Sequence, residues 1–325
     1  MTAAGISREG IYPRFPKLKT YQKNLAPPPK KWNVERLAAL TRFSKEGPFY
    51  LSAEAKQPFG PALASSFLMS VGLEHACSAI QAALRGDELW FEPWRQWVSY
   101  AYWAQRISTV WTLHGQPQVL NAAGVARAEH AGGLFLDRIG ATLGNCLSLG
   151  WTEFAVNLAE SANAALLTGT FVDAGHWGSR RTQHFMLRLV GDWQGWPPRQ
   201  STKSKDDKIV FDEPLFNVLI EKWRTTDIAT IEFLLLAACD RHTQQSRTDS
   251  SSKFYDMRNL ENYFDPFEVL SVMRLRELSG LENPRIAHPL TSTPLGRLPP
   301  LTQPYHDELL DGILRQGKRA WFPEL

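Results

Sequence analysis

The stretch that most constrains how this chain can fold lies near its end, where one helix carries both a start signal and a stop signal. Asp265 is placed to be the N-cap, Pro266 the first helical residue and Glu268 the third, which is a capping box with aspartate as the cap. Gly280 then ends the helix, and Pro284 prevents it from resuming. The proline-rich tail that follows carries no catalytic motif.

Similar signals predict helices along most of the chain. Asn33 is a plausible N-cap for a helix that runs to about residue 44 and turns Leu37, Leu40 and Phe43 to one face. Further helices are expected over residues 73–85, 93–115, 118–131, 134–149, 152–167, 180–193, 214–223 and 228–242, with a short strand at 49–52. Their lengths differ too much for a repeat array, which also disfavours a stacked-helix scaffold. The sequence therefore predicts a mostly α fold, an irregular multi-helix bundle of about nine or ten helices with little or no β structure.

Two glycines stand four residues apart inside the helix expected at 134–149. Glycine in a helix interior costs about 1 kcal/mol relative to alanine. Gly140 and Gly144 therefore indicate a structural need for a residue without a side chain. We expect another helix to cross closely at this point.

The chain has two segments whose composition indicates domain boundaries. Residues 1–31 are basic and rich in proline, which favours an extended arm over a helix. Residues 195–213 begin with a polar, proline-containing stretch that is typical of a linker or mobile loop. We therefore expect an N-terminal helical lobe at 32–194 and a C-terminal helical lobe with a proline-rich tail at 214–325, or one continuous domain.

Composition places the chain among globular proteins. Its 325 residues are 43% apolar and 21% charged, and its formal net charge is +3. That charge is too small to favour a direct nucleic-acid binder. The N-terminus has no apolar run of signal-peptide length, and Asp137 and Arg138 interrupt the nearest candidate for a membrane span, at 131–149. We predict a cytoplasmic protein without direct contact to membrane or nucleic acid.

The residue types that usually carry chemistry form no catalytic pattern. The eight histidines include no HExxH motif and no cluster at metal-ligand spacing. Cys77, Cys146 and Cys239 are isolated, which indicates small buried side chains rather than disulfides or zinc ligands. Neither a GxSxG elbow nor a phosphate-binding glycine loop is present. We predict no catalytic residue, no metal site and no cofactor, so a protein that is not an enzyme.

One strongly apolar helix nevertheless carries a polar stripe. Its polar residues recur at helical spacing: Arg95, Ser99, Tyr102, Arg106 and Thr109. The stripe could line a groove for a carboxylate-rich ligand, or its arginines could pair with structural acids. A pocket around Arg95, Tyr102 and Arg106 is the basis of an alternative hypothesis, an all-α enzyme that binds a small molecule.

Three motifs stand close together near the end of the chain. The helix start FDPFEVL is followed by LRELSGL and HPLTSTPLGRLP, within residues 264–299, about a tenth of the chain. This region resembles the closing part of mostly helical immunity proteins of bacterial polymorphic-toxin and type VI secretion systems, among them partners of endonuclease-type effectors. The resemblance implies an inhibitor that binds and occludes a cognate toxin acting in the cytoplasm, and it transfers no catalytic residue.

An inhibitor of this kind should make its strongest contacts through aromatic and arginine side chains, because these dominate interface energies. We select the candidates that flank breaks between helices: Trp177, Arg180, Arg181, Trp193 and Trp196. The alternative is that each tryptophan belongs to the core. Because the chain is slightly basic, we expect it to cover the acidic metal-binding centre of a nuclease, or to block assembly, rather than to imitate DNA.

Overall fold

The computed structural model describes residues 25, 30–52, 57–114, 119–120, 126–127, 134–167, 171, 180–197, 213–250 and 253–325. Within these ranges the chain forms ten α-helices, and its few strands make two short hairpins. The predicted mostly α fold with little β structure is confirmed. The predicted arm at 1–31 and the predicted linker at 195–213 lie almost wholly outside the described residues.

The α-helices are α2 (Lys30–Glu46), α3 (Pro61–Leu84), α4 (Phe91–His114), α5 (Leu136–Ser148), α6 (Thr152–Leu167), α7 (Arg181–Gln194), α9 (Pro214–Lys222), α10 (Ile228–Gln245), α11 (Phe267–Leu278) and α12 (Glu308–Ala320). Short 3-10 turns are η1 (Glu88–Trp90), η2 (Leu260–Asn262), η3 (Pro289–Ser292) and η4 (Pro294–Gly296). Strand β1 (Tyr50–Ser52) pairs antiparallel with β2 (Gln57–Pro58), as β3 (Val119–Leu120) does with β4 (Ala126–Arg127).

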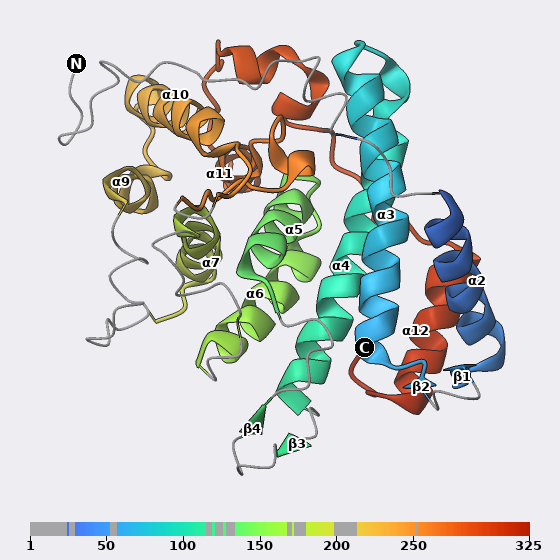
Figure 1. Cartoon of the computed structure of the whole chain (residues 1–325). Coiled ribbons are helices and arrows are strands. Elements are labelled where there is room, and N and C mark those ends of the chain that lie inside the picture. Colours follow the sequence, from blue (N-terminus) through green and yellow to red (C-terminus); the bar gives the residue numbers. More distant parts are fainter. Residues whose placement is uncertain are drawn as a thin grey trace.

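The helices are arranged as successive rows across the molecule (Figure 1). At one end α9 packs on α10 and α7, and α7 packs on α5 and α6. In the middle α4 joins α5 and α6 to α3, and at the other end α2 packs on α3 and α12. Helices from the two predicted lobes interleave, because α11 packs on α5 and α12 returns to α2.

Several predicted stop and start signals operate as expected. Gly86 after α3 and Gly280 after α11 have φ angles of +75° and +72°, which glycine adopts without the strain of a side chain. At the start of α10, the carboxylate of Asp227 accepts hydrogen bonds from the backbone N–H groups of Ala229 and Thr230. These helices end and begin where the sequence indicates.

The predicted close crossing at the two glycines of α5 is also present. A Cβ atom on Gly140 would lie 2.5 Å from Cγ of Gln183 on α7, and one on Gly144 would lie 2.5 Å from Cδ2 of Phe267 on α11. Real Cβ atoms do not approach other heavy atoms so closely. The two glycines therefore let α5 contact two different helices, and this places α7 and α11 against the same core helix.

Two predicted N-caps are wrong. Asn33 lies inside α2, where it is buried and its side-chain amide donates to Glu74 of α3. Asp265 is buried ahead of α11, whose first turn receives no side-chain cap, and Glu268 instead faces a buried histidine. Both cap patterns are local in sequence, whereas the partners that these side chains find come from distant segments.

Three further elements differ from the prediction. α3 begins at Pro61 rather than near residue 73, and the described residues within 118–131 form the β3–β4 hairpin instead of a helix. α12 was not predicted and follows the proline-rich tail. Its N-cap is Asp307, which accepts from the backbone N–H of Leu310 at 2.8 Å, and Leu310 and Ile313 are buried.

One helix in the described part of the chain, α3, has the length and apolar composition of a membrane span. Half of its most apolar window is buried inside the protein, where α3 packs along α4. The apolar run noted at 131–149 is instead largely the core helix α5, most of whose residues are buried. Burial of both segments is the pattern of core helices.

Candidate protein-binding surface

The polar stripe of α4 faces the chain's own C-terminal segment, residues 297–307. Arg95 donates from Nη1 to Oγ1 of Thr302 and to the carbonyl of Gln303, both at 3.3 Å. Oγ of Ser99 accepts the backbone N–H of Tyr305 at 2.9 Å. The predicted groove for a ligand is therefore filled at this end of the stripe by the protein itself.

The rest of the stripe packs in the same way. Tyr102 is 2% exposed, and its ring stacks on Phe154 with 3.9 Å between ring centres. Arg106 donates to Oγ of Ser161 on α6 and to the backbone carbonyl of Glu324. Arg95, Tyr102 and Arg106 are thus engaged by separate elements, and they do not converge on a pocket.

Four of the five residues predicted to contact a partner lie in the described part of the chain, while Trp177 lies outside it. Arg180 is 1% exposed and sits inside the protein, where a partner cannot reach it in this conformation. Arg181, Trp193 and Trp196 are half-buried, and both tryptophans pack against the core. Trp193 also lines an open hollow between the end of α7 and the start of α6, so its role in binding stays a prediction.

Arg180 belongs to a buried ionic cluster that sequence spacing does not reveal. Its Nη1 donates to the carbonyl of Tyr255 at 2.7 Å, and its Nη2 lies 3.9 Å from the carboxylates of Asp137 and Asp249. Its φ angle of +78° is left-handed, which is unusual for a residue with a side chain. The cluster joins α5, α7 and the segment before η2, which is a structural role.

The residues at the end of α10 are likewise tied to distant partners. Nδ1 of His242 lies 2.8 Å from Oε1 of Glu268, and its Nε2 lies 2.8 Å from the carbonyl of Asn262. Burial alone would lower the pKa of His242, but these two acceptors outweigh it and raise the pKa. His288 pairs with Asp240 at 3.1 Å. These buried pairs account for the polar residues here.

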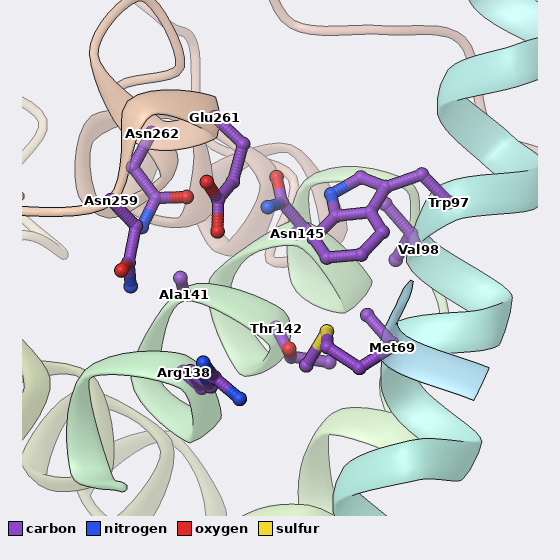
Figure 2. A pocket seen from close by; sticks show the side chains of 11 residues that line it. Met69, Trp97, Val98, Arg138, Ala141, Thr142, Asn145, Asn259, Glu261 and Asn262 are labelled. Atoms are coloured by element: carbon purple, nitrogen blue, oxygen red, sulfur yellow. The ribbon is translucent and has the colours of Figure 1, made fainter. Parts of the chain in front are cut away.

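A narrow pocket lies between α3, α4, α5 and η2 (Figure 2). Glu261 and Trp97 stand on opposite sides of it, with Asn145 between them in this view. Burial raises the pKa of Glu261. The pocket offers about 10 Å³ to the centre of a water molecule, which is room for roughly one water. In this conformation it does not admit a substrate-sized molecule.

The described residues contain no group of three or more His, Cys, Asp or Glu side chains placed to hold a metal ion. Cys77, Cys146 and Cys239 are buried, as their spacing predicts, and none of them forms a disulfide. No family model, no curated protein and no solved structure matches this chain. The resemblance to immunity proteins therefore stays a prediction, and the surface has to be interpreted from its own chemistry.

Several large apolar side chains are exposed on α2 and β1. Trp32 is 55% exposed, Tyr50 62% and Leu51 38%. Val34 and Leu37 on α2 are also exposed, so Leu37 does not belong to the buried face that its spacing suggests. Other exposed leucines in the described residues stand singly on distant elements. Of these residues, Trp32 and Leu51 line one surface hollow, and we call the surface around it the α2–β1 face.

A surface hollow opens on the α2–β1 face. It is lined by Trp32, Glu35, Arg36, Ala39, Leu51 and Phe67. The guanidinium carbon of Arg36 lies 5.6 Å from the ring centre of Trp32 and 5.8 Å from that of Phe67. Both distances are in the range of cation–π contacts. An arginine is thus held between an exposed and a half-buried aromatic ring at the surface.

This face is not among the sites that the sequence predicts. Its signal is the spacing of Trp32 and Arg36, which places the two side chains on one turn-to-turn row of a helix. The contribution of Leu51 and Phe67 comes from other elements, so it could not be derived from α2 alone. The breaks between helices point instead to residues near the ends of α7.

Proposed function

We propose that this chain is an immunity protein that binds and neutralises a cognate toxin by stoichiometric occlusion. The single observation that carries the proposal is the α2–β1 face, where Trp32 and Leu51 expose apolar surface next to Arg36. Contiguous exposed apolar surface is typical of protein interaction sites. Tryptophan, tyrosine and arginine are also the residue types that contribute most to interface energies.

The toxin acts in the cytoplasm under this proposal, and its class is that of a secreted nuclease effector. The motifs at 264–299 are the support for this class, since they resemble the closing region of such immunity proteins. The net charge of +3 fits an inhibitor that covers an acidic centre better than one that imitates DNA. The protein itself has no enzymatic role in this proposal.

The test is a co-expression experiment with the protein encoded next to this one. That neighbour is induced in the cytoplasm of a bacterial host with and without this chain, while growth and DNA integrity are followed. We expect killing that this chain relieves, co-purification of the two proteins, and loss of DNA when the chain is omitted. A neighbour that is harmless, or whose toxicity persists with this chain present, contradicts the proposal.

Matched variants locate the surface. Trp32→Ala combined with Leu51→Ala should abolish protection, because Trp32 is a large exposed anchor worth roughly 2 kcal/mol or more at the centre of an interface and Leu51 lines the same hollow. Leu89→Ala is the control, since Leu89 is 77% exposed but stands apart on η1. Loss of protection from Arg181→Ala with Trp193→Ala, and not from the first pair, would assign binding to the end of α7 instead.

A further inference from the structure

We propose that the hollow around Arg36 is a recognition site for a carboxylate side chain on an acidic protein partner. The inference deepens the proposed function, because it names the chemistry that the toxin presents to the α2–β1 face. The group that occupies the hollow is the carboxylate of an aspartate or a glutamate. The aromatic and aliphatic walls would contact the apolar neighbours of that carboxylate.

The first observation is that Arg36 is held in place without a polar partner. No hydrogen bond or ion pair of Arg36 occurs among the described residues, although its guanidinium lies near the Trp32 and Phe67 rings. Glu35 lines the same hollow but forms no ion pair with it. Stacking on aromatic rings uses the flat face of a guanidinium and leaves its edge N–H groups able to donate.

Arg42 lies further along α2 and shows that an arginine beside an aromatic ring can also have an acidic partner in this helix. Arg42 lies 4.3 Å from the Phe49 ring centre, and its Nε also donates to Glu46 at 3.0 Å. The charge of Arg42 is therefore already paired with an acid of the same helix. Arg36 has the same kind of aromatic support and lacks the acid.

A carboxylate is the ligand that this arrangement fits best. The planar guanidinium matches the two oxygens of a carboxylate, and charge-assisted hydrogen bonds of this kind are about twice as strong as neutral ones. A pre-organised arginine loses less side-chain entropy on binding than a free one. The adjoining apolar surface of Trp32 and Leu51 shields the contact from water, which strengthens it further.

The test uses a peptide of four glutamates, with a peptide of four glutamines as the neutral counterpart. Each is titrated into the full chain while NMR follows the indole N–H of Trp32 and the Nε–H of Arg36. We expect saturable shifts of both signals with the acidic peptide, reduced at higher salt, and none with the neutral one. The shifts should disappear in Arg36→Gln and persist in Arg42→Gln, which removes the same charge from the same helix.

Absence of shifts in the wild type, or equal shifts in Arg36→Gln, overturns the inference. This outcome is independent of the co-expression experiment, because the peptide needs no toxin. If the chain protects cells but shows no Arg36-dependent shift, the proposed function stands and the carboxylate site is refuted. If the chain shows the shift but does not protect cells, the carboxylate site stands and the proposed function is refuted. With a toxin in hand, Arg36→Gln should weaken binding by roughly tenfold or more and Arg42→Gln should not.

Discussion

The carboxylate of Asp256 lies 2.7 Å from Nη2 of Arg241, and the two side chains meet in the interior between the start of α7 and the end of α10. The same carboxylate accepts the backbone N–H of Thr182 at 3.0 Å and its hydroxyl at 2.9 Å. Asp256 thus supplies the first turn of α7 with the acceptor that Arg180, the residue at the N-cap position, does not provide. An acid distant in sequence caps the helix.

Removing the cation of this pair should be costly. Arg241→Ala leaves the buried Asp256 carboxylate without its ion partner, so we expect the free energy of unfolding to fall by about 3–5 kcal/mol. Urea denaturation measures the change. Arg42→Ala breaks a pair whose side chains are 52% and 63% exposed, and it should cost about 1 kcal/mol or less. Equal effects of the two substitutions would show that the buried pair has no special weight.

The same pair predicts a loss of stability in acid. Burial alone would raise the pKa of Asp256, but Arg241 and Thr182 outweigh it and lower the pKa to about 2. Because the folded pKa lies below that of the unfolded chain, the contribution is complete above about pH 4 and is lost as the pH falls towards 2. In Asp256→Asn, the urea concentration at the unfolding midpoint should depend less on pH between about pH 4 and 2. A variant with the wild-type acid profile contradicts this assignment.

Asp265 should act in the opposite direction. Burial raises its pKa to about 7. A folded pKa above the unfolded value means that stability is complete below about pH 4 and declines as the pH rises to 7, by up to about 1.4 kcal/mol per unit of pKa difference. Asp265→Asn keeps the shape without the charge, so its stability should decline less over this range. Denaturant midpoints at pH 4, 6 and 8 measure the difference between variant and wild type, and parallel curves refute the prediction.

The close crossing at Gly144 should not tolerate a methyl group. Gly144→Ala places Cβ against Phe267 of α11, and we expect a loss of about 1–3 kcal/mol through overpacking. Gly191→Ala is the matched control inside α7, where the nearest heavy atom is 3.5 Å from the new Cβ. That change should be neutral or stabilising, because alanine favours helices. Thermal melting compares the two, and a stable Gly144→Ala would mean that the crossing can widen.

The C-terminal segment should loosen when its buried arginine is removed. Arg274 donates to the carbonyls of Ser148 and Pro299, so Arg274→Met leaves both acceptors without this donor, at about 1–3 kcal/mol. Hydrogen exchange should accelerate at the amide of Thr302, which donates to Leu149 at 3.3 Å. The exposed Arg285→Met is the control. If hydrogen exchange at Thr302 is unchanged in Arg274→Met, the Arg274 contacts do not hold the C-terminal segment in place.

Helices with a proline or a cap at the start and glycine at the end could be predicted from the sequence, because those signals act within one turn. Asp227 and Gly280 are such cases. Asp307 carries the same kind of signal at α12. The prolines before it suggest an extended tail, but this cap marks the start of a helix within one turn.

Other features could not be predicted, because the partners that decide them come from distant segments. Asp265 looks like a cap, but its surroundings are set by α5 and α10. Arg180 looks exposed in the sequence, but Asp137 and Asp249 from two distant segments lie beside its buried guanidinium. The hollow of the candidate site needs α2, β1 and α3 together. Only the spacing of Trp32 and Arg36 was visible in the sequence.

The pairing of α2 with α12 also has a consequence for how the protein is made. A ribosome releases α2 early and α12 only after most of the chain has followed, yet the two helices complete one end of the molecule together. Until the end of α12 emerges, the buried Phe43 of α2 lacks the Trp321 ring that stacks on it, and contacts so distant in sequence form slowly. Nascent chains stalled before α12 should therefore bind chaperones at α2. Each copy completes this end of the fold only after α12 has been synthesised.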